Sequence, residues 1–141
     1  MRVLAVLTAW LLLWTGTAIA DPVGDSIRAL GTDQSTRVRL AAAASLSREN
    51  RDPRAVIALA GALRNDADNG IRRIAALALA RMIDARTAPD AMQLAFTALD
   101  DAKDNDRSSD VSVAAANTLL KIGRFRPIKA SKTPKKKGNG P

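Results

Sequence analysis

Acidic side chains concentrate in one stretch of the chain, where closely spaced carboxylates could bind calcium or work as an acid–base pair. Five aspartates fall within residues 100–110, and residues 104–108 have the Asp-x-Asp-x-Ser spacing with which a twelve-residue calcium loop begins. Such a loop needs glycine at its sixth position and glutamate at its twelfth, where this chain has Ser109 and Ala115. We therefore predict solvated turns with aspartate caps, in an inserted loop that could serve as a contact edge.

The residue types required by most enzymes are missing. The chain has no cysteine and no histidine, which excludes disulfides, thiolate or imidazole metal ligands, and triads with a histidine base. The pair Asp100/Asp101 falls in a predicted turn without an apolar wall, and the acidic turn at residues 66–70 also lacks the calcium-loop pattern. The glycines of residues 138–140 precede no helix and cannot form a phosphate loop. We predict no catalytic residue, no metal site and no cofactor.

Cations recur at fixed spacing in the middle of the chain. The candidate partner-binding residues are Arg39, Arg48, Arg72, Arg81 and Lys121. One interpretation is structural: Arg39 and Arg72 can pair with turn aspartates such as Asp33 and Asp66, and the other three lie near helix C-termini, where the helix dipole favours cations. The other interpretation is that these side chains present positive charge to an acidic protein partner. The sequence leaves both open.

A second group of cations follows position 122 without any acidic residue. Its members are Arg124, Arg126, Lys129, Lys132, Lys135, Lys136 and Lys137. Residues 21–122 carry fourteen basic and fourteen acidic side chains, so the net charge of +8 belongs to the two ends of the chain. The Pro, Lys and Gly content predicts a disordered tail over 124–141. This tail could contact an anionic membrane or envelope polymer.

The first twenty residues have the layout of a secretory signal peptide. Arg2 precedes an apolar run over residues 3–14, and Ala18 and Ala20 place small residues at −3 and −1 before Asp21. We predict cleavage between Ala20 and Asp21 and a periplasmic or secreted protein. An uncleaved anchor is the alternative, although the run is shorter than the about 20 apolar residues of a spanning helix.

The remaining chain is built from a helical repeat. The segments VRLAAAASLSR (38–48), IRRIAALALAR (71–81) and VSVAAANTLLK (111–121) align at offsets of 33 and 40 residues. The second and third follow apolar i, i+3, i+4, i+7 segments, and the first follows a weaker one with Ser26 in place of an apolar residue. A proline, which is favoured at the first position of a helix, opens each of these segments. The predicted helices span 23–31, 36–48, 53–65, 70–83, 88–103 and 110–122. Asp52 is the expected N-cap of the third helix, and Thr87 with Asp90 a capping box for the fifth.

The pairing of Asp-Pro-Arg-Ala-Val at 52–56 with a Val-Arg-x-Ala-Ala-Ala-x-x-Leu second helix, as at 38–46, resembles the HEAT repeat in its short bacterial form. The resemblance covers residues 21–123. It implies an all-α fold, a short α-solenoid of three helix pairs at about 21–50, 51–84 and 85–123, whose second helices line the concave face. The third copy departs from the pattern by a seven-residue insertion and by Ser112 in place of the second-helix arginine.

These features favour an exported, non-enzymatic scaffold that binds another, unidentified protein in the cell envelope. The alternative is a polyanion-binding module that acts through the tail. Phycobilin lyases and DNA glycosylases also contain HEAT-like repeats, but this chain has no cysteine or histidine for a tetrapyrrole. It also has no tryptophan or tyrosine beyond position 20 to stack on a base, which argues against specific nucleic-acid binding.

No fourth repeat is available to cover the last helix. Val113 and Leu120 therefore remain uncovered unless the segment 123–128 folds back over that end or another molecule binds there.

Overall fold

The computed structural model describes residues 19–49 and 51–128. This part of the chain is helical and has no strand, which confirms the all-α fold. Its elements are α1 (Pro22–Thr32), α2 (Thr36–Leu46), α3 (Pro53–Asn65), α4 (Asn69–Met82), α5 (Pro89–Asn105), α6 (Ser109–Ile122) and the short 3-10 helix η1 (Gly123–Phe125). Within the described residues, no helix combines the length and the apolar character needed to cross a membrane.

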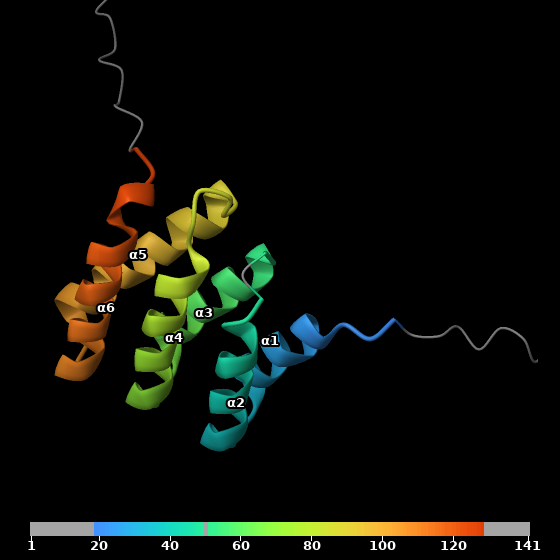
Figure 1. The fold of residues 1–141 in the computed structure, drawn as a ribbon. Helices are drawn as coiled ribbons and strands as arrows, with labels where there is room; N and C mark the ends of the chain where they lie inside the picture. The colour runs from blue at the N-terminus through green and yellow to red at the C-terminus, as the bar shows by residue number, and fades with distance from the viewer. Residues whose placement is uncertain (1–18, 50, 129–141) are drawn as a thin grey trace, which may run out of the picture.

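The helices form two layers, as a solenoid requires. Helices α1, α3 and α5 lie side by side in one layer, and α2, α4 and α6 in the other (Figure 1). Each first helix also packs against the second helix of its own pair. The three helix pairs are therefore stacked in series, which confirms the short α-solenoid.

Aspartates and prolines set the helix starts. Pro22, Pro53 and Pro89 each occupy the first turn of a first helix, where the missing N–H costs least. The Asp52 carboxylate accepts a hydrogen bond from the Arg54 N–H at 2.9 Å, as predicted for the N-cap of α3.

The predicted capping box of α5 is wrong. Ala88 is the N-cap of this helix and makes no side-chain capping bond. The hydroxyl of Thr87 instead accepts a hydrogen bond from the Asp84 N–H at 3.0 Å and donates one to the Met82 carbonyl at 3.4 Å. Thr87 closes the preceding loop because its hydroxyl reaches the end of α4.

The core is aliphatic and depends on small residues in the second helices. Ala43 and Ala76 are both fully buried, and alanine at these positions lets neighbouring helices approach closely. The buried Thr118 hydroxyl donates a hydrogen bond to the Ala76 carbonyl at 2.9 Å, which joins α6 to α4. Phe96, on α5, is the largest of the fully buried side chains in the described residues.

Part of the third repeat's insertion lengthens a helix instead of forming a loop. Asp100 and Asp101 lie within α5, as the predicted helix 88–103 requires, and their assignment to a turn is wrong; α5 has 17 residues against 13 in α3. The difference of four residues is about one helical turn. The helix continues because Ala102 is buried and the Asn105 amide donates a hydrogen bond to the Asp101 carboxylate at 2.9 Å, one turn back.

The chain after α6 folds back onto α5. Phe125 packs partly buried against the core, and Arg126 binds the Asp100 carboxylate at 2.7 and 3.0 Å. The Arg126 guanidinium also lies 4.8 Å from the centre of the Phe96 ring. The predicted tail therefore begins with residues that pack on the fold; its remainder, 129–141, lies outside the described residues. We call residues 123–127 the C-terminal strap.

The strap contacts α5 through Arg126 and the end of α6 through η1, but it leaves the outer face of α6 uncovered. Val113 and Leu120 stay 58% and 84% exposed. Segment 123–128 turns toward α5 and does not cover Val113 and Leu120, so the fold-back cover considered for this end is not observed and the outer face of the last helix stays open.

Candidate protein-binding surface

Arg39 and Arg72 connect successive repeats through paired hydrogen bonds. Arg39 donates from Nε and Nη2 to the Asp66 carboxylate at 2.9 and 3.1 Å. Arg72 donates from the same two nitrogens to the Asp106 carboxylate, both at 2.9 Å. These two fork-shaped pairs, Arg39–Asp66 and Arg72–Asp106, form what we call the Arg–Asp ladder.

The third guanidinium nitrogen of each arginine holds the turn of its own repeat. Arg39 Nη1 donates to the carbonyls of Asp33 and Gln34 at 3.0 and 3.2 Å. Arg72 Nη1 donates to the carbonyls of Asp66 and Ala67 at 2.9 and 3.2 Å. Each arginine thus ties the turn before its helix to the turn of the next repeat.

The ladder is shielded from solvent. The side chains of Arg39 and Arg72 are 14% and 4% exposed. Hydrogen bonds to Asp66 and Asp106 raise the pKa of Arg39 and Arg72, respectively, above the ordinary value. The same contact with Arg72 lowers the pKa of Asp106. Both arginines are engaged within the fold, as the structural interpretation of the sequence expected.

The actual partners differ in part from those named from the sequence. Asp66 is a partner of Arg39 as expected, but Asp33 contributes only its backbone carbonyl. At the equivalent place in α6, Ser112 donates hydrogen bonds to the carbonyls of Ala102 and Asp106 at 3.2 and 3.4 Å. The ladder therefore ends at Ser112, which reaches only its own repeat.

The other three candidate cations lie on the surface. Arg48, Arg81 and Lys121 are exposed near the C-terminal ends of α2, α4 and α6. None forms an ion pair with another residue that the structure describes. Among the five cations proposed from the sequence, these three are the ones that a partner could reach.

Exposed residues extend from these cations into a larger surface that crosses all three second helices. At intervals of four residues, each helix presents three exposed positions that align at the offsets of 33 and 40. We call this set the second-helix surface: Leu40 and Ala44 on α2 with Arg48 just beyond its end, Arg73, Leu77 and Arg81 on α4, and Val113, Asn117 and Lys121 on α6.

This surface combines apolar and positively charged side chains. Leu40, Leu77 and Val113 are 37%, 43% and 58% exposed. Helices α2 and α4 contain five arginines and no acidic residue, whereas α5 in the other layer carries four aspartates and one lysine. The sequence interpretation missed Leu40, Arg73 and Leu77, although the same offsets that align Arg48 with Arg81 would have placed them on this face.

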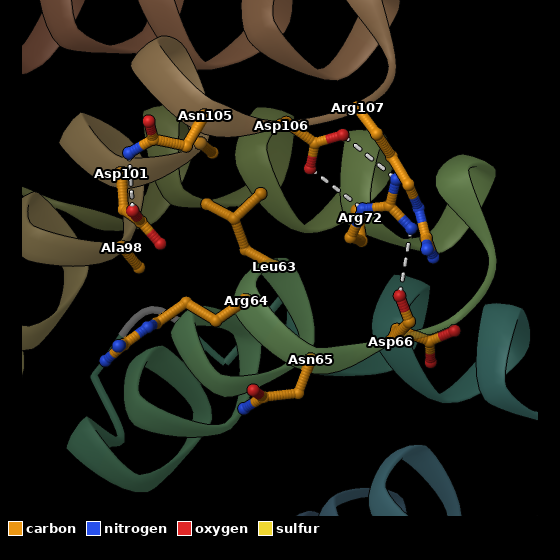
Figure 2. A pocket seen from close by; sticks show the side chains of 11 residues that line it. Leu63, Arg64, Asn65, Asp66, Arg72, Ala98, Asp101, Asn105, Asp106 and Arg107 are labelled. Atoms are coloured by element: carbon orange, nitrogen blue, oxygen red, sulfur yellow. Dashed lines mark hydrogen bonds and ion pairs between the residues drawn. The ribbon is translucent and has the colours of Figure 1, made fainter.

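A groove of about 410 Å³ lies where the C-terminal ends of α3 and α5 meet the ladder. Figure 2 shows Arg72 in this groove, between the Asp106 carboxylate and the segment at Asp66. The groove is lined by three arginines and three aspartates, among other residues: Arg64, Arg72, Arg107, Asp66, Asp101 and Asp106. Their charges balance, and Arg72 and Asp106 are already paired with each other, so the groove does not favour a charged ligand.

The residues that line this groove do not support metal binding or catalysis. In the described ranges, no three acidic residues come together to hold a metal ion. Arg72 and Asp106 pair with each other, Asp66 pairs with Arg39, and no serine lines the groove. The exposed second-helix surface is therefore the strongest candidate site of the described chain.

Comparison with protein families gives one match. A family model described as HEAT repeats matches residues 9–80, which include the first helix pair, α3 and most of α4. No curated protein and no solved structure matches the chain.

Proposed function

The chain belongs to the HEAT-repeat family, and from this premise we propose that it is an exported, non-enzymatic scaffold that binds a protein partner in the cell envelope. HEAT repeats generally mediate protein–protein interactions. The family supports protein binding in general. The binding surface, the chemistry of the partner and the location in the cell are argued separately below.

The second-helix surface is the observation that carries the proposal. Its exposed leucines at 40 and 77 lie beside cations such as Arg81, which forms no ion pair with another described residue. Such a mixture of apolar and basic groups suits a partner segment in which acidic side chains alternate with apolar ones. Apolar burial would supply most of the affinity and charge complementarity the specificity and the association rate.

The binding test compares two double variants of equal charge change. Immobilised processed protein, residues 21–141, is incubated with envelope extract at low salt. A matched sample carries Arg73→Glu and Arg81→Glu. The control carries Arg28→Glu and Arg86→Glu, two exposed cations outside the second-helix surface. We expect the first variant to lose a partner that the wild type and the control both retain.

Two outcomes would contradict the assigned surface. Recovery of no stable protein partner would reject a scaffold role, and equal recovery by both variants would move the binding site elsewhere. Circular dichroism of each variant shows whether the helical fold survives the substitutions.

Export rests on the first twenty residues, of which residues 1–18 lie outside the described part. Cleavage after Ala20 would remove Trp10 and Trp14 and leave a chain without tryptophan or tyrosine. We expect the exported protein to begin at Asp21 and to absorb almost no light at 280 nm. An intact mass that retains residues 1–20 would instead favour a membrane anchor.

The tail supports a second candidate function, binding to a polyanion. Residues 21–122 are electrically neutral, and all seven charged residues beyond them are basic. Deleting residues 129–141 should then abolish binding to vesicles that contain anionic lipid, and salt should weaken binding by the intact chain. Unchanged, salt-insensitive binding after the deletion would reject this candidate.

A further inference from the structure

We propose that the solenoid end formed by α1 and α2 is a docking seat for a single α-helix of another protein, whose arginine binds the Asp33 carboxylate. This seat lies on the N-terminal end of the stack and is separate from the second-helix surface. Four observations carry the inference.

The first observation is that Asp33 has the same local geometry as the two aspartates of the Arg–Asp ladder. The Asp33 Oδ1 accepts a hydrogen bond from the backbone N–H two residues ahead at 2.8 Å. The corresponding distances at Asp66 and Asp106 are 2.9 and 2.8 Å. This turn orients the carboxylate before an arginine binds it. The Asp33 carboxylate is therefore oriented to accept an arginine, as those of Asp66 and Asp106 are.

The second observation is that this acceptor has no arginine. Asp66 receives Arg39 from the preceding repeat, and Asp106 receives Arg72. Asp33 belongs to the first repeat, and its carboxylate forms no ion pair within residues 19–49 and 51–128. Arg39 lies nearby, but it binds the backbone carbonyl of Asp33 and directs its fork to Asp66.

The third observation is an uncovered apolar residue beside the acceptor. Val38 of α2 aligns with Ile71 of α4 and Val111 of α6 at the offsets of the repeat. Ile71 and Val111 are fully buried, whereas Val38 is 41% exposed, since within residues 19–49 and 51–128 no second helix precedes α2. An arginine-bearing helix packed on α2 would cover Val38 and reach Asp33 together.

The fourth observation limits the occupant to one helix. On α3, Ala58 and Gly61 line the space against α1. The equivalent positions on α1, 33 residues earlier, are Asp25 and Arg28, which form an exposed ion pair at 3.1 Å. A preceding first helix would have to bury these charges, so the outer side of α1 does not suit one, and the seat on α2 remains.

The ladder also defines the chemistry of the docking helix. The donor helices α2 and α4 share the pattern Arg-x3-Ala-x2-Leu, from Arg39 to Leu46 and from Arg72 to Leu79. Arginine supplies the fork, alanine permits close approach, and leucine fills the interface. We therefore assign the seat to a partner helix with this pattern.

This chain does not supply such a helix itself. The position 33 residues before Arg39 is Val6, and the aligned place in α6 is Ser112. No arginine follows Arg126. Neither the leader, the last helix of a second copy nor the distal tail therefore offers the required donor at the ladder register.

The test uses a peptide of residues 66–83, which carries Arg72, Ala76 and Leu79, as the probe helix. A side-chain crosslink that replaces Arg73 and Leu77 on its outward face holds it helical, and a fluorophore reports anisotropy. A matched peptide carries Arg72→Gln. The target is the processed protein, residues 21–141, as wild type, as Asp33→Asn, and as the control Asp25→Asn.

Asp33→Asn keeps an oxygen acceptor for the turn but removes the charge that binds arginine. We expect saturable binding of the arginine peptide to the wild type and the control, about tenfold weaker binding to Asp33→Asn, and a similar loss with the glutamine peptide. Combining both changes should cost little more than either alone.

Several results would overturn the proposal. They are absence of saturable binding, equal affinity of the two peptides, and an effect of Asp25→Asn as large as that of Asp33→Asn. Sedimentation of the processed protein alone tests the remaining occupant: concentration-dependent self-association that Asp33→Asn abolishes would assign the seat to a second copy. Unchanged circular dichroism of Asp33→Asn would show that its fold is intact.

Discussion

Single arginine side chains determine how the repeats of this solenoid are aligned. Each ladder arginine satisfies a carboxylate and two carbonyls, so the fork fits only when the next turn is in the correct register. A buried ion pair contributes little net stability compared with apolar packing, but loss of one partner leaves an uncompensated charge. The ladder therefore specifies geometry more than it adds stability.

Replacement of Arg72 by alanine should be strongly destabilising. It leaves the Asp106 carboxylate, 8% exposed, without its partner, and it also frees the turn carbonyls. We expect a loss of about 2–3 kcal/mol in the free energy of unfolding, measured by urea denaturation followed by circular dichroism. Arg73→Ala, at the exposed neighbouring position, is the control and should change stability by less than about 0.5 kcal/mol. Similar losses in the two variants would contradict a structural role for the ladder.

The ladder also makes the free energy of unfolding depend on pH. The pKa of Asp106 is lowered by its hydrogen bonds with Arg72, so the unfolded chain binds a proton at this residue before the folded chain does. The contribution of the ionised Asp106 to the free energy of unfolding is therefore fully present above the ordinary carboxyl pKa of about 4. It is lost as the pH falls from there through the lowered pKa of Asp106 in the folded protein. Asp106→Asn should remove this contribution and flatten the acid limb of a stability–pH curve. An unchanged acid limb would show that other carboxylates dominate it.

The structural contacts of these residues were partly visible in the sequence. The 33-residue repeat predicted Asp66 as an arginine partner, because a turn aspartate and a second-helix arginine recur together. Nothing local shows that Arg39 reaches forward to Asp66 and uses only the backbone of Asp33. The pairing of Arg39 with the Asp66 carboxylate depends on how one helix pair stacks on the next. The same pairing leaves the Asp33 carboxylate without this arginine.

Helix boundaries followed from local chemistry wherever a proline or a capping aspartate was present. The predicted and observed spans of α3 agree, because Asp52 and Pro53 define its start. The predicted end of α5, at residue 103, lies two residues before the observed end at Asn105. Burial of Ala102 extends the helix, and this burial requires the neighbouring repeat.

Glycine gives a direct test at the level of one helix. Gly61 lies inside α3, and a Cβ added there would meet no atom within 4 Å. Gly61→Ala should therefore stabilise the protein by about 0.5–1 kcal/mol, because alanine favours the helix and restricts the unfolded chain. Thermal unfolding followed by circular dichroism would measure the gain.

Gly24→Ala is the matched control for this prediction. A Cβ at Gly24 would lie 2.4 Å from the Asp21 carboxylate that caps α1, so the capping side chain would have to move. We expect no gain at this site. Equal stabilisation at both glycines would mean that helix propensity alone decides the effect and that the capping contact is dispensable.

Burial is unequal along the whole molecule, although the repeats look alike. Helix α1 buries only Leu30, and α2 buries three residues, whereas α4 and α5 bury seven each. The strap adds Phe125 and Arg126 at the opposite end. The strap could not be derived from the sequence, because Arg126 meets Asp100 and Phe96 only after the third pair has folded. Within the described residues, the first helix pair thus contributes the fewest buried residues to the core.

In a solenoid, each repeat is stabilised by its own packing and by its neighbours, so an end repeat with little burial should open first. We expect backbone amides of α1 and α2 to exchange with deuterium faster than those of α3 to α6, as measured by native-state hydrogen exchange.

Leu30→Ala should accelerate exchange only in the first pair. Leu79→Ala, in the middle of the stack, should accelerate it throughout, since it removes a fully buried side chain at a cost of about 2–5 kcal/mol. Uniform acceleration by both variants would mean that the three pairs unfold as one unit. Faster exchange in α6 than in α1 would mean that neither the strap nor the larger number of buried residues stabilises the C-terminal end. Binding of an arginine-bearing helix at Asp33 should selectively slow exchange in the first pair, because that pair is the one the partner would complete.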